Sequence, residues 1–146
     1  GNIFNQNKII AVHIRRGDYE AQGNDEMGGK DLRLPFQYYK NCFEKIADLS
    51  NCKVFFISDD MEFSKAHYNH MSNSYFDTNK SIIDFQILLN ADVLILANSS
   101  FSWWAAYLNK KDHKTIFAPK YWLGFKVKKE YPVQVICPDW DINECG

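Results

Sequence analysis

The stretch KIIAVHIRRGDY, residues 8–19, decides the fold class of this chain. Its first part, Lys8–Ile14, is almost continuously apolar and rich in β-branched side chains. That composition is typical of a strand that is covered on both faces. Charged residues follow at once, with Arg15, Arg16 and Asp18 at the carboxyl end of the strand. We therefore expect an inner strand of a parallel sheet with a polar group of residues at its end.

Short apolar segments alternate with helical patterns along the rest of the chain. The further predicted strands are Lys53–Ser58, Ser74–Phe76, Asp92–Ala97, Thr115–Ala118 and Val133–Cys137. The predicted helices are Phe36–Leu49, Ser81–Asn90 and Ser100–Leu108, and the acidic residues Asp59, Asp60 and Glu62 fit another helix N-terminus. This alternation predicts the α/β class, with a Rossmann-like parallel sheet flanked by helices and joined by right-handed crossovers.

The composition is that of one soluble globular domain. The chain has 146 residues, a net charge of −1 and 46% hydrophobic residues, so we expect a single domain over residues 1–146. The near-neutral charge argues against nucleic acid as a partner. The cysteines, Cys42, Cys52, Cys137 and Cys145, lack the CxxC spacing of zinc sites. No metal site is therefore expected, and a reducing compartment is favoured.

Polar motifs follow three of the predicted strands. They are HIRRGDY from His13, SDD from Ser58 and NSSFSWW from Asn98. Because the carboxyl ends of parallel strands meet at one edge of a sheet, we expect these motifs to converge there. The run Asp18–Leu34 starts at the same edge and has no periodicity. Connections of this length in compact domains are usually functional, so this edge is the predicted binding site.

The residue types at this edge suit an anion. Ser99 and Ser100 offer hydroxyl groups beside the free N–H groups of a helix N-terminus. Arg15 and Arg16 supply fork-shaped cationic donors that match phosphate oxygens. The chain has neither GxGxxG after the first strand nor GxxxxGK[ST]. A diphosphate bound here would therefore depend on cationic side chains instead of a glycine-rich loop.

Each of these features also has a simpler structural explanation. An arginine pair after a strand is more often a surface or salt-bridge element, and Asp59–Asp60 fits a plain helix start. Trp103 and Trp104 fit a buried core better than a ligand-stacking face. The lysine-rich stretch Lys110–Lys129 fits a solvated face, with contact to a membrane surface as the alternative.

The motifs taken together closely resemble the family 11 fucosyltransferases, which are α1,2-fucosyltransferases. The matching segments, between Lys8 and Trp122, are HIRRGDY, FISDD, Asp84, NSSFSWWAAYL and APKYW. The resemblance implies inverting, metal-independent transfer of fucose from GDP-fucose to a galactose hydroxyl of a glycan. It also implies a GT-B-type architecture with two Rossmann-like domains. Family members are longer and carry HxRRGDY near the middle, so the chain is expected to be the donor-binding C-terminal half without the acceptor-side half.

The resemblance also assigns roles to individual residues. The set expected to bind the donor is His13, Arg15, Arg16, Asp84, Asn98, Ser99 and Ser100. Arg15 would clamp the β-phosphate and stabilise the charge that grows on the GDP leaving group. His13 and Asp84 would lie near the guanine, and Ser99 and Ser100 would donate hydrogen bonds to phosphate.

The general base that must deprotonate the acceptor stays unassigned. The long loop offers Asp18, Glu20, Asp25 and Glu26, of which Asp18 fits better as the structural partner of an arginine. A nucleotide-sugar-binding module without catalysis is the alternative function. Acceptor-dependent release of GDP would separate the two.

The expected location is the bacterial cytoplasm, with peripheral attachment to the inner membrane as an option. Asn98-Ser99-Ser100 is formally an N-glycosylation sequon. A glycan there would block the predicted phosphate site, so a compartment without N-glycosylation is favoured. The expected partners are GDP-fucose and a galactose-containing acceptor.

Overall fold

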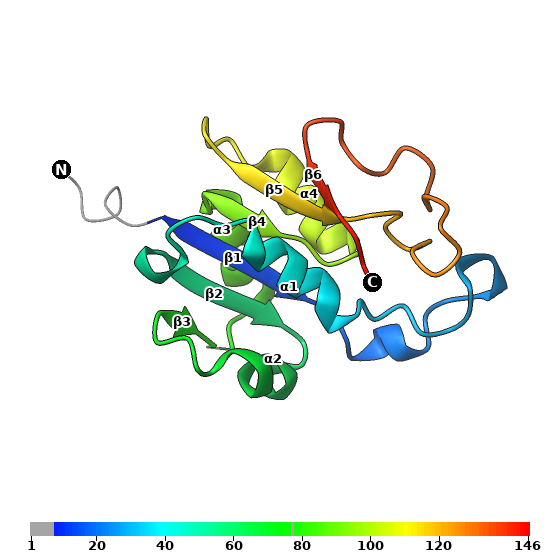
Figure 1. Cartoon of the computed structure of the whole chain (residues 1–146), viewed down its shortest axis with the longest axis horizontal. Coiled ribbons are helices and arrows are strands. Elements are labelled where there is room, and N and C mark those ends of the chain that lie inside the picture. Colours follow the sequence, from blue (N-terminus) through cyan, green and yellow to red (C-terminus); the bar gives the residue numbers. More distant parts are fainter. Residues whose placement is uncertain (1–7, 77) are drawn as a thin grey trace.

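Six parallel strands form one sheet with helices on both of its faces (Figure 1). The computed structural model describes residues 8–76 and 78–146. Residues 1–7 of the predicted domain 1–146 therefore lie outside the described part. The strands are β1 (Ile9–Ile14), β2 (Lys53–Ser58), β3 (Ser74–Tyr75), β4 (Val93–Ile95), β5 (Thr115–Pro119) and β6 (Asp141–Asn143). The helices of more than one turn are α1 (Phe36–Glu44), α2 (Met61–Tyr68), α3 (Ser81–Asn90) and α4 (Ser100–Leu108).

The strand order is β3-β2-β1-β4-β5-β6. β1 is therefore central, with Ile10 in register with Val54 of β2 on one side and with Val93 of β4 on the other. The chain winds outward from β1 in one direction, then returns past it to β4 and continues the other way. This is the Rossmann-like order, in which ligands bind beyond the carboxyl ends of the strands where the winding direction reverses. Here that point lies between β1 and β4.

Two hydrophobic layers cover the sheet, one on each face. Buried side chains of α1, such as Tyr38 and Tyr39, pack with Ile10 and Phe56 on the first face. On the second face, α3 and α4 pack on each other and on the remaining strand residues, with Leu88 fully buried. Figure 1 shows α1 in front of the sheet and α3 and α4 behind it. Coverage on both faces explains why β1 is apolar along nearly its whole length.

Most predicted elements are confirmed. Lys53–Ser58, Ser81–Asn90 and Ser100–Leu108 have the expected bounds, and Ser99 caps α4 by accepting a hydrogen bond from the Ser102 N–H at 3.3 Å. The predicted helix Phe36–Leu49 is too long, because α1 ends at Glu44. A left-handed residue, Asp48, with φ of 55°, then turns the chain into a short 3₁₀ segment.

The prediction of a strand at Val133–Cys137 is wrong. The Glu130 carboxylate accepts hydrogen bonds from the N–H groups of Gln134 at 2.9 Å and Ile136 at 3.4 Å, so a side chain takes the place of a neighbouring strand. Val133 itself is 80% exposed. The last strand of the sheet is β6, whose sequence Asp-Ile-Asn carries no apolar run that would have predicted it.

The exposure of Trp104 corrects the sequence interpretation, which placed both Trp103 and Trp104 in the core. Trp104 is 53% exposed, so it is not a core residue, whereas Trp103 packs against Trp140 and donates to the Val135 carbonyl at 2.6 Å. Most lysines of the stretch Lys110–Lys129 are exposed, as expected of a solvated face, and some of them form surface ion pairs, for example Lys120 with Glu144 at 2.8 Å. Within residues 8–76 and 78–146, no helix combines the length and the apolar character needed to cross a membrane.

Candidate functional site

The three polar motifs meet at the carboxyl edge of the sheet, as predicted. β1 ends at Ile14, β2 ends at Ser58, and β4 leads through Asn98 and Ser99 into α4. A pocket of about 260 Å³ opens at this edge. It is lined by His13, Arg15, Ile57, Ser58, Asp59, Asn79, Ser81, Asp84 and Phe101. The pocket thus combines residues from β1, β2, α3 and α4 beside the point where the winding of the sheet reverses.

Arg15 is the cation of this pocket, and it lies between two carboxylates. Its Nη2 and Nε donate to one oxygen of Asp18 at 2.8 and 3.1 Å, and its Nε lies 3.5 Å from Asp59. The guanidinium also lies 5.3 Å from the centre of the Tyr19 ring. The pairing with Asp18 confirms the structural role expected for that carboxylate. Among the described residues no contact involves Nη1, so this group can still donate to a ligand.

Asp59 is more than the start of a helix. Asp60 is the residue that caps α2, accepting from the Phe63 N–H at 3.0 Å. Asp59 instead accepts from the backbone N–H of Arg16 at 2.8 Å and faces Arg15. A Cβ at Gly17 would lie 2.6 Å from the Asp59 carboxylate, so only glycine allows this approach. The turn after β1 is therefore built around Asp59, which sequence reasoning had treated as one half of a helix start.

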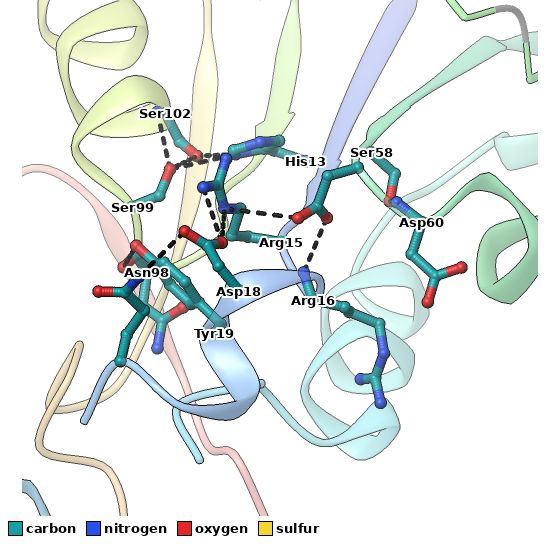
Figure 2. A network of polar contacts seen from close by, with 12 residues as sticks. His13, Arg15, Arg16, Asp18, Tyr19, Ser58, Asp60, Asn98, Ser99 and Ser102 are labelled. Carbon is teal, nitrogen blue, oxygen red and sulfur yellow. Dashed lines mark hydrogen bonds and ion pairs between the residues drawn. The ribbon is translucent and has the colours of Figure 1, made fainter. Parts of the chain in front are cut away.

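Arg16 does not bring its side chain to the pocket. Its guanidinium lies 3.9 Å from the centre of the Phe63 ring on α2. In Figure 2 the side chains of Arg15 and Arg16 extend in opposite directions from the turn. The two adjacent arginines therefore have different roles: Arg15 lines the pocket, and Arg16 packs on α2.

His13 is buried and connects β1 to the start of α4. Its Nδ1 is hydrogen-bonded to the Ser102 hydroxyl and lies 3.4 Å from the Ser99 hydroxyl. Desolvation, and secondarily the positive charge of Arg15, lowers the pKa of His13 from 6.5 to about 3. The ring is therefore neutral at neutral pH. Figure 2 shows His13, Ser99 and Ser102 together behind Arg15.

Asn98 holds the long loop onto the sheet. Its carbonyl accepts from the Tyr19 hydroxyl at 3.1 Å, and its side-chain amide donates to the Leu32 carbonyl at 3.0 Å. Only 1% of Asn98 is exposed, which leaves no room for a glycan on the sequon. The side-chain oxygen is buried without a partner among the described residues. Asn98 is thus a structural residue that fixes the loop Asp18–Leu34 beside the pocket.

Asp84 lies in the first turn of α3 and lines the pocket. Burial raises the pKa of its carboxyl group, and a hydrogen bond from Asn79 opposes that shift. Both explanations that the sequence left open therefore hold for Asp84: it is a carboxylate in the first turn of a helix, and it also lines the pocket. Across the pocket, Arg15 and Asp84 present opposite charges.

The other predicted site residues lie next to the pocket but do not line it. Ser99 is buried behind His13, and Ser100 is exposed at the first position of α4. None of the four base candidates Asp18, Glu20, Asp25 and Glu26 lines the pocket. Sequence reasoning missed Asp59, Ser81 and Ser102 as site residues. Their position in the sequence was the only signal: Asp59 directly follows β2, Ser81 begins α3, and Ser102 lies in the motif NSSFSWW.

A second pocket, of about 330 Å³, lies near the ends of β5 and β6. It is lined by Lys120, Tyr121, Lys128 and Glu144, among others, and Lys120 is already paired with Glu144. It contains none of the residues of the three converging motifs. The smaller pocket is therefore the better candidate site, because it combines the uncommitted Nη1 group of Arg15, a neutral histidine and a position beside the reversal point of the sheet.

The part of the chain that the structure describes has no group of three or more His, Cys, Asp or Glu side chains arranged to hold a metal ion. The four cysteines are all free thiols. Burial raises the pKa of Cys42 to about 12 and that of Cys145 to about 12, so these thiols are protonated and unreactive.

Comparison with known proteins links this arrangement to a family. The sequence model described as Glycosyl transferase family 11 matches residues 1–140. An alpha-1,2-colitosyltransferase of Escherichia coli is 34% identical over 119 residues, which cover 77% of this chain and 40% of that protein. The O-antigen biosynthesis glycosyltransferase WbnK of Escherichia coli is 32% identical over 119 residues, covering 78% of this chain and 39% of that protein. No solved structure matches. The chain thus spans about two fifths of the length of these curated relatives.

Proposed function

This chain belongs to glycosyl transferase family 11, and we propose that it binds GDP-fucose and supplies the donor side of an α1,2-fucosyltransferase. The acceptor in this proposal is a galactose hydroxyl of a glycan, and the transfer is inverting and uses no metal. The domain would be the donor-binding half of a GT-B-type enzyme. One relative is named for α1,2 transfer of colitose, which agrees with the linkage but differs in the sugar. GDP, the part of the donor that the pocket would hold, is therefore the first probe.

The observation that carries the proposal is the Arg15 side chain at the reversal point of the sheet. Inverting transfer leaves negative charge on the departing diphosphate, and a fixed guanidinium there stabilises that charge. Arg15 has a free Nη1 and is already oriented by Asp18 and Asp59. Orientation before the ligand arrives reduces the entropy lost on binding.

The two carboxylates beside Arg15 reduce its net attraction for an anion. Asp18 is half exposed, whereas Asp59 is anchored by the Arg16 backbone. We expect a diphosphate to displace the Asp18 contact while Asp59 continues to hold Nε. Charge on the phosphates exceeds that of one carboxylate, so the exchange favours the ligand.

His13 and Asp84 are proposed to contact the guanine. The Asp84 carboxylate can accept from the N1–H and amino group of guanine, which would select it over bases that lack this pair of donors. His13 is neutral, so it contributes a directed hydrogen bond without adding charge. Ser100, which is exposed at the start of α4, is proposed to donate to phosphate, because the helix N-terminus favours negative charge there. The buried Ser99 does not reach the pocket with its hydroxyl group, which corrects the role expected for it; it caps α4 instead.

The test is calorimetric titration of the chain with GDP and GMP. Wild-type protein should bind GDP more tightly than GMP, because only GDP carries a β-phosphate for Arg15. Arg15→Ala should weaken GDP binding about tenfold to hundredfold, the usual range for a hydrogen bond to a charged group, and should leave GMP binding nearly unchanged. Arg33→Ala is the matched control, since that guanidinium is paired with Asp31 at 2.8 Å and lies outside the pocket.

Equal GDP affinity in wild type and Arg15→Ala would refute the clamp. Absence of GDP binding by the wild-type chain would refute the donor site as a whole. A binding module without catalysis is separated from a transferase by adding a galactose-containing acceptor to GDP-fucose and measuring released GDP. Release only in the presence of acceptor supports transfer, and donor binding without release supports the module.

A further inference from the structure

Ser102 is a buried serine of α4 whose hydroxyl contacts the pocket only through other residues. It is fully buried and does not line the pocket, yet its hydroxyl bonds Nδ1 of His13. The same hydroxyl lies 3.3 Å from that of Ser99, and its backbone N–H donates to Ser99. Ser102 is thus the centre of a buried polar cluster with His13 and Ser99, seen behind Arg15 in Figure 2.

The cluster leaves one ring nitrogen of His13 for the pocket. Among residues 8–76 and 78–146, the hydrogen bonds of the His13 ring all involve Nδ1, so Nε2 is the ring nitrogen that remains for a ligand. A neutral imidazole carries one proton, so one nitrogen donates and the other accepts. The partner of Nδ1 therefore decides what Nε2 can do.

The charges around the pocket favour one of the two tautomers. Asp59 and Asp84 line the pocket with carboxylate oxygens, and the positive charge of Arg15, which also lines it, is offset by its ion pairs with Asp18 and Asp59. A lone pair on Nε2 would face these acceptors unfavourably, whereas an N–H group on Nε2 would be attracted to them. With the proton on Nε2, Nδ1 must accept, and the Ser102 hydroxyl is its donor.

We infer that Ser102 is a positioning residue: its hydroxyl donates to Nδ1 of His13 and holds the ring in the tautomer that presents Nε2–H to the pocket. The inference deepens the proposed function and rests on it only for the identity of the ligand. It explains why a fully buried position in the first turn of α4 carries a hydroxyl group. The low pKa of His13 is consistent with it, because a neutral ring is needed for a defined tautomer.

The first test is nitrogen-15 NMR of the histidine rings in the chain without ligand, with the His13 signals assigned by their absence in His13→Asn. Wild-type His13 should be protonated on Nε2 and unprotonated on Nδ1. Ser102→Ala should give a mixture of tautomers, because Nδ1 loses its nearer donor and keeps only the longer 3.4 Å contact with the Ser99 hydroxyl. Ser102→Thr, which retains a hydroxyl, should restore the wild-type signal. Ser64→Ala is the matched control, since Ser64 is equally buried on α2 but outside the pocket.

The second test is the GDP affinity of the same variants. Ser102→Ala should weaken GDP binding about threefold to tenfold, the usual effect of one neutral hydrogen bond, and Ser64→Ala should not. Wild-type His13 protonated on Nδ1, or an unchanged Nε2 tautomer in Ser102→Ala, would overturn the inference. If the wild-type chain fails to bind GDP while the tautomer results hold, the proposed ligand fails and the role of Ser102 in fixing the ring stands.

Discussion

Acid should destabilise this fold through His13, which is 5% exposed and whose ring contacts the hydroxyl groups of Ser99 and Ser102. Its pKa is about 3 in the folded chain and 6.5 in the unfolded chain. Between these two pKa values, the His13 side chain is protonated in the unfolded chain and neutral in the folded chain. The stability contributed by neutral His13 is therefore complete above the unfolded value and is lost progressively as the pH falls toward the folded value.

The magnitude follows from the size of this window. Each pH unit inside it costs about 1.36 kcal/mol in the free energy of unfolding. Acidification from about pH 7 to about pH 5 crosses roughly 1.5 units of the window, so the loss from His13 alone is about 2 kcal/mol. This is a large share of the roughly 5–15 kcal/mol by which domains are stable.

Urea denaturation at several pH values measures this loss directly. His13→Asn is the reference, because asparagine does not titrate and can still bond the Ser102 hydroxyl. The variant is expected to be less stable than wild type near neutral pH, and the difference should shrink by about 2 kcal/mol on acidification. The other titrating groups are common to both proteins and cancel in the difference. Parallel loss of stability in the two proteins would refute the assignment of a neutral, desolvated His13.

Two further changes test the elements that hold the pocket together. Gly17→Ala should weaken GDP binding severalfold in calorimetry, because the new methyl group would lie 2.6 Å from the Asp59 carboxylate and push it away from Arg15; an unchanged affinity would mean that Asp59 does not orient the arginine. Tyr19→Phe should cost about 1 kcal/mol in urea unfolding and speed proteolysis of the loop Asp18–Leu34, because the 3.1 Å hydrogen bond to Asn98 is lost. Exposed Tyr107→Phe is its control, and equal cleavage rates in the two variants would contradict the tether.

The sheet could be predicted from the sequence because its inner strands are covered on both faces. β1, β2 and β4 are short, continuous apolar runs, and the helices between them have clear periodicity. β6 could not be found this way, since an edge strand with the sequence Asp-Ile-Asn is held by its neighbour β5. The false strand at Val133–Cys137 has strand-like residues, but a carboxylate from Glu130 satisfies its backbone.

The position of the candidate site was also predictable, because strand–helix alternation predicts parallel strands and parallel strands bring their carboxyl ends to one edge. The motifs HIRRGDY, FISDD and NSSFSWW therefore identified the edge, and the resemblance that they carry agrees with the family match over residues 1–140.

Which residues of those motifs line the pocket was decided only by the tertiary structure. Adjacent residues in a turn project in different directions, so Arg15 faces the pocket while Arg16 covers Phe63. The partners of a side chain come from other elements, which is why Asp59 and Ser102 emerged as site residues only in three dimensions. Sequence records which chemical groups arrive at the edge of the sheet; packing decides which of them face the ligand, since directions and distances between elements are not encoded in local periodicity.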